Sequence, residues 1–180
     1  HDDDTLLVVS RELDAAEQAS AIVWLERARA EGRHLALVAS RDSAHDIDAW
    51  LAILPGLVEL GQQGAEQVRL AVHEVSTNVA EHACGMDPNQ RFDLWWVPDG
   101  EGCHFLLRDR GRSFRYHEWQ PSRFSDPAVR RRGRGFGLDI VHRVMSRVEY
   151  YPGTREGNLT CLTFDPRKLS MREEVHESHR

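Results

Sequence analysis

The apolar positions of the chain fall into two long helical patterns. In the longer one, between Gly64 and about Cys84, apolar residues recur every three or four positions, which is typical of a buried helix face. These residues are Val68, Leu70, Ala71, Val72, Val75 and Val79. Gly85, directly after this segment, predicts the end of the helix. The other pattern covers 42–61, and a Pro-Gly pair predicts a helix end near Leu54.

A third helix is predicted near the start of the chain. Asp14 and Glu17 have the spacing of a capping box, in which each side chain accepts a hydrogen bond from the backbone N–H of the other residue. The helix then runs to about Ala30, and Gly32 ends it. We expect its apolar side to consist of Ala15, Ala19, Ile22, Val23 and Leu25.

Short runs rich in β-branched and aromatic residues predict the strands. They cover residues 34–40, 91–97, 103–108, 148–151 and 158–165. The turn sequence at 98–100, Pro-Asp-Gly, joins the second and third of these strands. A chain of 180 residues is about one domain and long enough to bury a core.

Composition and charge exclude several classes of protein. The chain is 41% hydrophobic and 29% charged, as in ordinary globular proteins, and its net charge of −6 argues against a general nucleic-acid binder. No apolar stretch approaches the roughly 20 residues needed to span a bilayer, and no signal peptide is visible, so we expect no membrane partner. Cys84, Cys103 and Cys161 form no C-x-x-C pair, which argues against a zinc site or disulfide framework and fits a reducing cytoplasm.

The longest helix carries a candidate reaction centre. At about 100° per residue, its polar residues fall on one stripe, namely Glu74, Asn78, Glu81 and His82. The Glu74 carboxylate could take a proton from an attacking hydroxyl, and the Asn78 carbonyl oxygen is a hard ligand suited to Mg²⁺. The alternative is an ordinary solvated face, and for His82 packing remains an alternative to a ligand contact.

Two later segments support the reaction centre. Asp109 and Gly111 follow directly after an apolar run, although Asp-x-Gly alone is a common turn. A glycine-rich segment precedes an apolar-periodic run, and it consists of Gly133, Arg134, Gly135, Phe136, Gly137 and Leu138. Glycines allow close backbone approach, and the free N–H groups at the start of the following helix would stabilise phosphate charge.

In this order, the three segments resemble the N, G1 and G2 boxes of the ATPase superfamily that includes gyrase and the histidine kinases. Residues 74–83 and 135–148 are similar to the anti-sigma-factor serine kinases, also called switch-protein kinases. The resemblance covers roughly residues 34–165. It implies the histidine-kinase-like ATPase (Bergerat) fold, an α/β (α+β) two-layer sandwich with a mixed sheet and helices on one face. Nucleotide would lie between the helices and a lid, here residues 115–132.

The resemblance implies an ATP-dependent protein serine/threonine kinase that phosphorylates a STAS-type anti-sigma-factor antagonist. Glu74 would be the general base, and Asn78 would coordinate Mg²⁺. Asp109 would accept a hydrogen bond from the adenine amino group, and Gly111 would let the backbone approach the base. Arg134 and the glycines Gly133, Gly135 and Gly137 would cradle the phosphates, and Phe136 and Leu138 of the same segment are further candidates for nucleotide binding.

The resemblance also suggests how the chain is divided. Residues 1–10 resemble the last strand of PP2C-type serine phosphatases, which predicts the kinase module of a longer phosphatase–kinase regulator; a tag remnant or an unrelated acidic terminus is the alternative. Residues 11–33 would form a connector helix, a dimerisation element or a docking arm. The kinase domain would cover 34–165, and 166–180 would be a polar tail.

Other functions share the three boxes. The catalytic domain of a sensor histidine kinase should follow a dimerisation helix with a phosphoacceptor histidine, and the helix at 14–30 contains none. A gyrase-like hydrolase would need transducer domains. A binding module would sequester a sigma or anti-sigma factor with ATP as a structural ligand, which the presence of Glu74 disfavours. A homodimer is a further expectation. Asn158 stands where the family often has a threonine after glycine, so we assign it no nucleotide contact.

Overall fold

The computed structural model describes residues 12–113 and 136–167, with the side chains of 136–139 excepted. The helices are α1 (Ala15–Glu31), α2 (Ser43–Leu51), α3 (Gly61–Asn78) and α5 (Phe136–Val144), with the short helical turns η1 (Val58–Leu60) and η2 (Val79–Ala83). The strands are β1 (Arg33–Val38), β2 (Arg91–Asp99), β3 (Gly102–Asp109), β4 (Arg147–Thr154) and β5 (Gly157–Phe164). Each predicted strand is therefore present, with bounds shifted by a few residues.

The strands form one five-stranded sheet in the order β1-β2-β3-β5-β4. Every described pairing is antiparallel, so the mixed sheet expected from the resemblance is corrected to an antiparallel one. The reason is the connectivity: β2–β3 and β4–β5 are hairpins that reverse the chain, and β5 lies between β3 and β4, antiparallel to both.

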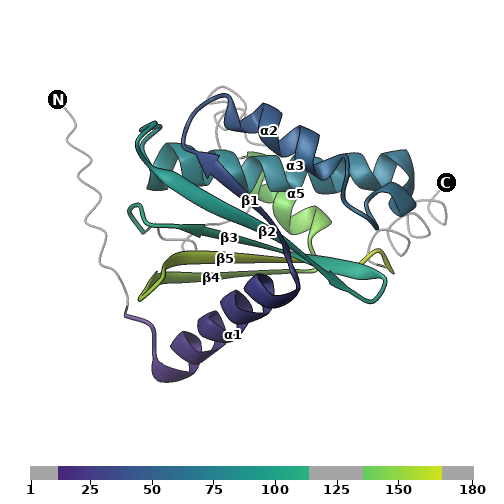
Figure 1. Cartoon of the computed structure of the whole chain (residues 1–180). Helices are drawn as coiled ribbons and strands as arrows, with labels where there is room; N and C mark the ends of the chain where they lie inside the picture. Colours follow the sequence, from purple (N-terminus) through teal and green to yellow (C-terminus); the bar gives the residue numbers. More distant parts are fainter. Residues whose placement is uncertain (1–11, 114–135, 168–180) are drawn as a thin grey trace.

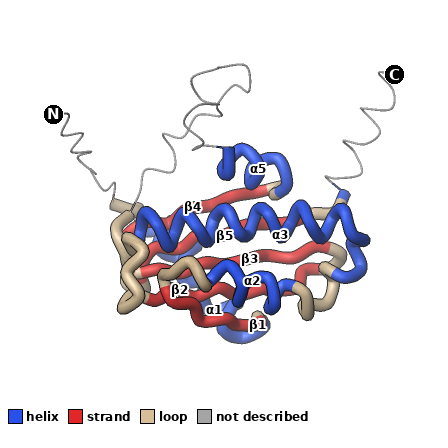
Figure 2. Tube along the Cα trace, turned by 90° about the horizontal axis from the view of Figure 1, so that it is seen from above, coloured by secondary structure: helices blue, strands red, loops and turns tan. Residues whose placement is uncertain are grey.

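Helices α2, α3 and α5 lie on one face of the sheet (Figure 1), and the view from above shows them side by side over the strands (Figure 2). This packing forms the main core, which the predicted apolar face of α3 helps to build. Its buried members include Leu37, Val68, Val72, Val75, Phe92, Leu94, Phe105, Leu107 and Leu162. The layering of helices on a sheet confirms the predicted α/β sandwich.

Helix α1 lies on the opposite face of the sheet (Figure 1), so the expectation of helices on one face only is corrected. Ala21, Leu25 and Ala28 pack into a second core together with strand residues. The strand residues are Trp95, Val97, Leu106, Tyr151, Leu159 and Cys161. Of the predicted apolar side of α1, Leu25 is buried as expected, whereas Ala15, Ala19, Ile22 and Val23 are exposed, the last two at 47% and 64%.

The second core has a physical cause in strand β3. Residues 103–107 of this strand are buried at every position, so the strand has an apolar surface on both faces of the sheet. A sheet that is apolar on both faces needs cover on both. Helix α1 supplies that cover, and the predicted capping box starts it: Glu17 N–H donates to Asp14 Oδ1 at 2.8 Å, and Asp14 N–H donates to Glu17 Oε2 at 3.0 Å.

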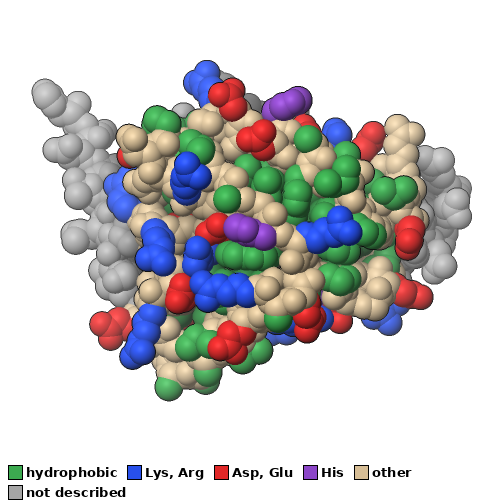
Figure 3. Space-filling view, in the orientation of Figure 1, with side chains coloured by type: hydrophobic (Ala, Val, Ile, Leu, Met, Phe, Trp, Pro, Cys, Tyr) green, Lys and Arg blue, Asp and Glu red, His purple; other side chains and the backbone are tan. Residues whose placement is uncertain are grey.

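The face of the molecule in Figure 3 is mixed in charge. Basic and acidic side chains lie next to one another over the face in Figure 3, with smaller apolar areas between them. None of the helices in the described part of the chain has the length and apolar character needed to cross a bilayer.

Candidate nucleotide-binding site

Helix α3 changes its geometry at its C-terminal end. After Asn78 the chain continues as the π-helical turn η2 (Val79–Ala83). Cys84 N–H donates to the carbonyl oxygen of Val79, five residues earlier, at 3.0 Å. A π-helical turn holds one residue more than an α-helical turn, so the side chains that follow are rotated from α-helical spacing. Such turns are frequent at functional sites.

The π-helical turn corrects the predicted polar stripe. Glu74 and Asn78, which precede it, are half-buried on α3, whereas Glu81 and His82 within it are exposed. The four residues therefore share no single environment. In the described part of the chain, neither Glu74 nor Asn78 has a hydrogen-bond or ion-pair partner for its side chain. Both side chains are thus available to a ligand, one helical turn apart.

Asp109 ends strand β3 and is buried, with 3% of its surface exposed. Its Oδ1 accepts hydrogen bonds from Gly111 N–H at 2.9 Å and from Asn158 Nδ2 at 2.8 Å. Burial raises the pKa of the Asp109 carboxyl above its ordinary value, and the two hydrogen bonds oppose this rise because they stabilise the ionised form.

At Gly111, the segment that carries Asp109 meets the end of the helix that carries Glu74 and Asn78. Arg112 N–H donates to the carbonyl oxygen of Ala83, the last residue of η2, at 2.9 Å. A Cβ atom on Gly111 would lie 2.0 Å from that same oxygen, so no other residue fits without a shift of the backbone. The segment of Asp109 is therefore joined to the end of the helix that bears Glu74 and Asn78.

The structure adds Asn158, to which the sequence analysis assigned no contact. This residue is the second of β5, directly after Gly157, and its amide contacts Asp109 across the strand pair. A Cβ atom on Gly157 would lie 2.1 Å from the Asp109 carbonyl oxygen, so the glycine permits this approach. The Gly-Asn pair, in the place where the family often has Gly-Thr, was the signal in the sequence.

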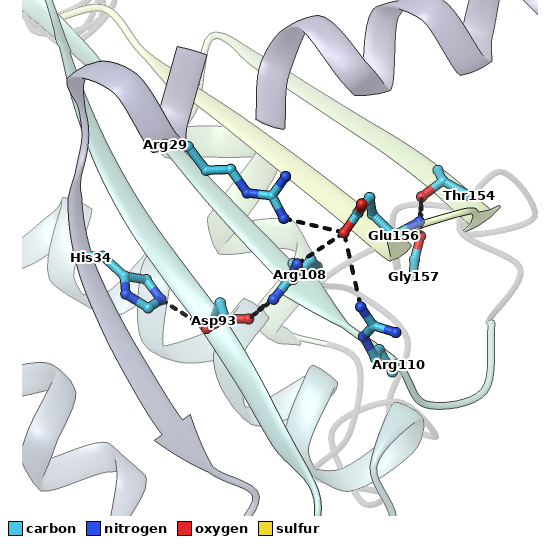
Figure 4. A network of polar contacts seen from close by, with 8 residues as sticks. All are labelled: Arg29, His34, Asp93, Arg108, Arg110, Thr154, Glu156 and Gly157. Carbon is cyan, nitrogen blue, oxygen red and sulfur yellow. Dashed lines mark hydrogen bonds and ion pairs between the residues drawn. The ribbon is translucent and has the colours of Figure 1, made fainter. Parts of the chain in front are cut away.

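The β4–β5 hairpin that carries Asn158 is held in place by charged side chains (Figure 4). Glu156 Oε2 accepts from Arg29 of α1 and from Arg108 of β3, both at 3.2 Å, and Arg110 lies 3.9 Å away. Arg108 also donates to Asp93 Oδ2 at 2.6 Å. These contacts connect α1, β2, β3 and the hairpin on the face of the sheet opposite α3.

The third predicted segment is only partly described. Gly133, Arg134, Gly135 and the lid at 115–132 lie outside the described residues, so their roles stay predictions. Phe136, Gly137 and Leu138 form the first turn of α5, and α5 packs against α3. As predicted, a helix starts at the glycine-rich segment, and it lies beside the helix that bears Glu74 and Asn78.

A model of the histidine kinase-like ATPase domain matches residues 18–164, which include most of α1 and the whole sheet. The chain belongs to the histidine kinase-like ATPase family. Over 106 residues it is also 30% identical to the methanogenesis regulatory histidine kinase FilI of Methanothrix harundinacea (strain 6Ac). The aligned part is 53% of this chain but 12% of FilI, so the similarity concerns one part of a much longer protein.

A histidine kinase-like ATPase domain implies ATP binding, and the described residues fit this ligand. Asp109 offers an anionic acceptor, which suits an exocyclic amino group. No three His, Cys, Asp or Glu side chains gather as a metal site among the described residues. The side-chain carbonyl oxygen of Asn78 is a hard ligand of the kind that Mg²⁺ prefers.

Proposed function

We propose that the chain is an ATP-dependent protein serine/threonine kinase that phosphorylates a STAS-type anti-sigma-factor antagonist. The observation that carries this proposal is Glu74, a half-buried carboxylate without a partner among the described residues, one helical turn before Asn78. When bound, Mg-ATP would supply the γ-phosphoryl group. As the substrate hydroxyl oxygen forms its bond to phosphorus and the bond to ADP breaks, Glu74 accepts the hydroxyl proton.

The other residues bind and orient the nucleotide in this proposal. Asp109 and Gly111 hold the adenine ring, and Asn78 holds Mg²⁺. The phosphates are held by Arg134 and the glycines Gly133, Gly135 and Gly137, and Phe136 and Leu138 belong to the same nucleotide-binding segment. A sigma or anti-sigma factor would be a further protein partner, and a second copy of the chain could complete a homodimer.

The similarity to FilI favours a second candidate, the catalytic domain of a sensor histidine kinase. In that case the acceptor would be a histidine nitrogen. Phosphoserine and phosphothreonine survive acid, whereas phosphohistidine is hydrolysed, so the chemistry of the product separates the two candidates. The proposal of a serine/threonine kinase therefore predicts an acid-stable phosphoprotein.

Glu74→Gln and Asn78→Ala test the assigned roles. We expect Glu74→Gln to bind Mg-ATP like the wild type but to lose on the order of 10² to 10⁴ in the rate of transfer, because the proton acceptor is lost. Asn78→Ala should lose the Mg²⁺-dependent part of ATP binding in calorimetry. Transfer is measured with labelled ATP on purified STAS-domain proteins and on the phosphoacceptor domain of a histidine kinase.

Glu81→Gln is the matched control, since Glu81 is an exposed carboxylate on the adjoining turn η2. It should bind and transfer at wild-type rates. Full transfer by Glu74→Gln would contradict the role of Glu74. ATP binding by the wild type without transfer to either acceptor would instead favour a module that sequesters its partner with ATP as a structural ligand.

A further inference from the structure

Asn158 is a fully occupied hydrogen-bonding centre. It is 2% exposed, and its Oδ1 accepts from Ser113 Oγ–H at 2.6 Å and from Gly153 N–H at 2.9 Å. Its Nδ2 donates to Asp109 Oδ1 at 2.8 Å and to the Gly111 carbonyl oxygen at 3.2 Å. An amide group has two donors and two acceptor sites, so none is left for a ligand.

The two oxygens of Asp109 differ in their surroundings. Oδ1 accepts both of the described hydrogen bonds, from Gly111 N–H and Asn158 Nδ2. Oδ2 has no hydrogen-bond partner among the described residues and is not among their fully buried unpaired atoms. A carboxylate this deeply buried is stable in its ionised form only where donors offset the loss of water.

We propose that Asn158 positions the Asp109 carboxylate for recognition of adenine. Asn158 fixes Oδ1 of Asp109 and keeps the carboxylate ionised. Oδ2 of Asp109 is then left to accept a hydrogen bond from the exocyclic amino group of adenine. This inference rests on the proposed nucleotide binding. Asn158 contacts no nucleotide itself. It acts through Asp109 and through the Gly111 peptide, which its second N–H group holds in place.

The surroundings of Asp109 allow its titration to be followed. The end of η2 contributes Cys84, whose pKa is raised to about 11, first by burial and then by the charges of Asp109 and Asp87. The Cys84 thiol therefore stays neutral below about pH 9. From the β4–β5 hairpin, Glu156 is paired with Arg29 and Arg108 and lies 3.9 Å from Arg110. A titration between pH 4 and about pH 8 on a labelled Asp109 carboxyl thus reports this group.

Asn158→Thr and Asn158→Val form a matched pair, because the two replacements have the same shape and differ in one hydroxyl donor. In the nucleotide-free protein, the ¹³C resonance of the Asp109 carboxyl gives its titration midpoint. We expect Asn158→Val to raise this midpoint by about one pH unit or more. The Asp109 carboxylate stays buried but loses the hydrogen bond from Asn158 Nδ2, which stabilises its ionised form. Asn158→Thr should restore a midpoint close to that of the wild type.

ATP affinity supplies the second measurement. An acceptor for the adenine amino group must be ionised, so affinity is present above the Asp109 midpoint and is lost as the pH falls through it. For Asn158→Val, we expect affinity to fall about tenfold for each pH unit below the raised midpoint and to recover at higher pH. Asn158→Thr should follow the wild-type profile.

The outcomes separate this inference from the proposed function. Equal midpoints for the Val, Thr and wild-type proteins would overturn the role of Asn158 even if ATP binds. Absence of ATP binding by the wild type at any pH would overturn the nucleotide-binding proposal on which the inference rests. If Asn158→Val does not fold, Ser113→Ala decides, because it removes one of the two hydrogen bonds to Asn158 Oδ1 without touching Asp109. For Ser113→Ala, a rise of the Asp109 midpoint that is smaller than the one expected for Asn158→Val supports the inference, and no rise contradicts it.

Discussion

Two glycines allow three segments of the chain to meet at Asp109. Gly111 admits the carbonyl oxygen of Ala83 from the end of η2, and Gly157 admits the carbonyl oxygen of Asp109 itself. At both positions a Cβ atom would lie within 2.1 Å of a backbone oxygen, which cannot move aside as a flexible side chain can. Convergence at this site thus depends on residues that carry no side chain.

Gly157→Ala is predicted to destabilise the protein more than an ordinary glycine replacement. Gly157 has a φ of 109° and a backbone oxygen in the way, whereas Gly100 has a φ of 59° and nothing within 4 Å of the place that a Cβ atom would take. We expect Gly157→Ala to lower the free energy of unfolding by about 3 kcal/mol or more and Gly100→Ala by about 1 kcal/mol. Urea denaturation checks both, and equal losses would contradict the close approach at Asp109.

At the scale of elements, α1 is a structural part of the domain. Its buried residues follow one another at spacings of four and three, which places Ala21, Leu25 and Ala28 on one stripe. Larger apolar residues, Ile22 and Val23, lie off this stripe and remain exposed. Two of the three buried residues are small alanines, so residue size alone misidentifies the buried side.

Leu25→Ala tests this arrangement. Leu25 is 2% exposed between α1 and the sheet, so its truncation should cost about 2–5 kcal/mol of the free energy of unfolding. Val23→Ala on the same helix is the control and should change stability by about 0.5 kcal/mol or less, because Val23 is 64% exposed. Chemical denaturation measures both. A Leu25→Ala protein as stable as the control would show that α1 does not pack on the sheet.

At the scale of the whole molecule, histidine–carboxylate pairs join elements to their neighbours, and in two of them the carboxyl pKa is lowered. His73 of α3 bonds Asp48 of α2 at 2.8 Å, and His104 of β3 bonds Asp99 at the end of β2 at 2.7 Å. In each pair the hydrogen bond from the histidine is the largest cause that lowers the pKa of the carboxyl. A carboxyl whose pKa is lowered in the folded protein stabilises the fold at pH values above its unfolded-state pKa, which is near 4. This contribution is lost as the pH falls through the folded-state pKa.

The protein should therefore lose stability between about pH 5 and pH 3. Asp48→Asn and Asp99→Asn should each lower the free energy of unfolding at pH 7 by about 0.5 kcal/mol and flatten this pH dependence. The effect is modest because both side chains are about half exposed, at 46% and 53%. Asp46→Asn, an exposed carboxylate on α2, is the control. Thermal unfolding at several pH values measures the slope; an unchanged slope in both variants would contradict the assignment.

Much of the architecture could be predicted from short-range patterns. The five strands, the apolar face of α3, the capping box of Asp14 and the helix after the glycine-rich segment all depend on residues within a few positions of one another. The three boxes also predicted the histidine kinase-like ATPase family, because their residues and order resemble those of known members.

The tertiary structure decided what depends on distant contacts. Asn158 and Asp109 are 49 positions apart, and their hydrogen bond exists only because β5 pairs with β3. The buried stripe of α1 was fixed by a sheet with two apolar faces, and the antiparallel pairing by the place of β5 between its neighbours. The sequence by itself determined which groups the chain contains and the family to which it belongs. Only packing determined which of those groups meet, because a local pattern carries no information on the segment that will lie opposite it.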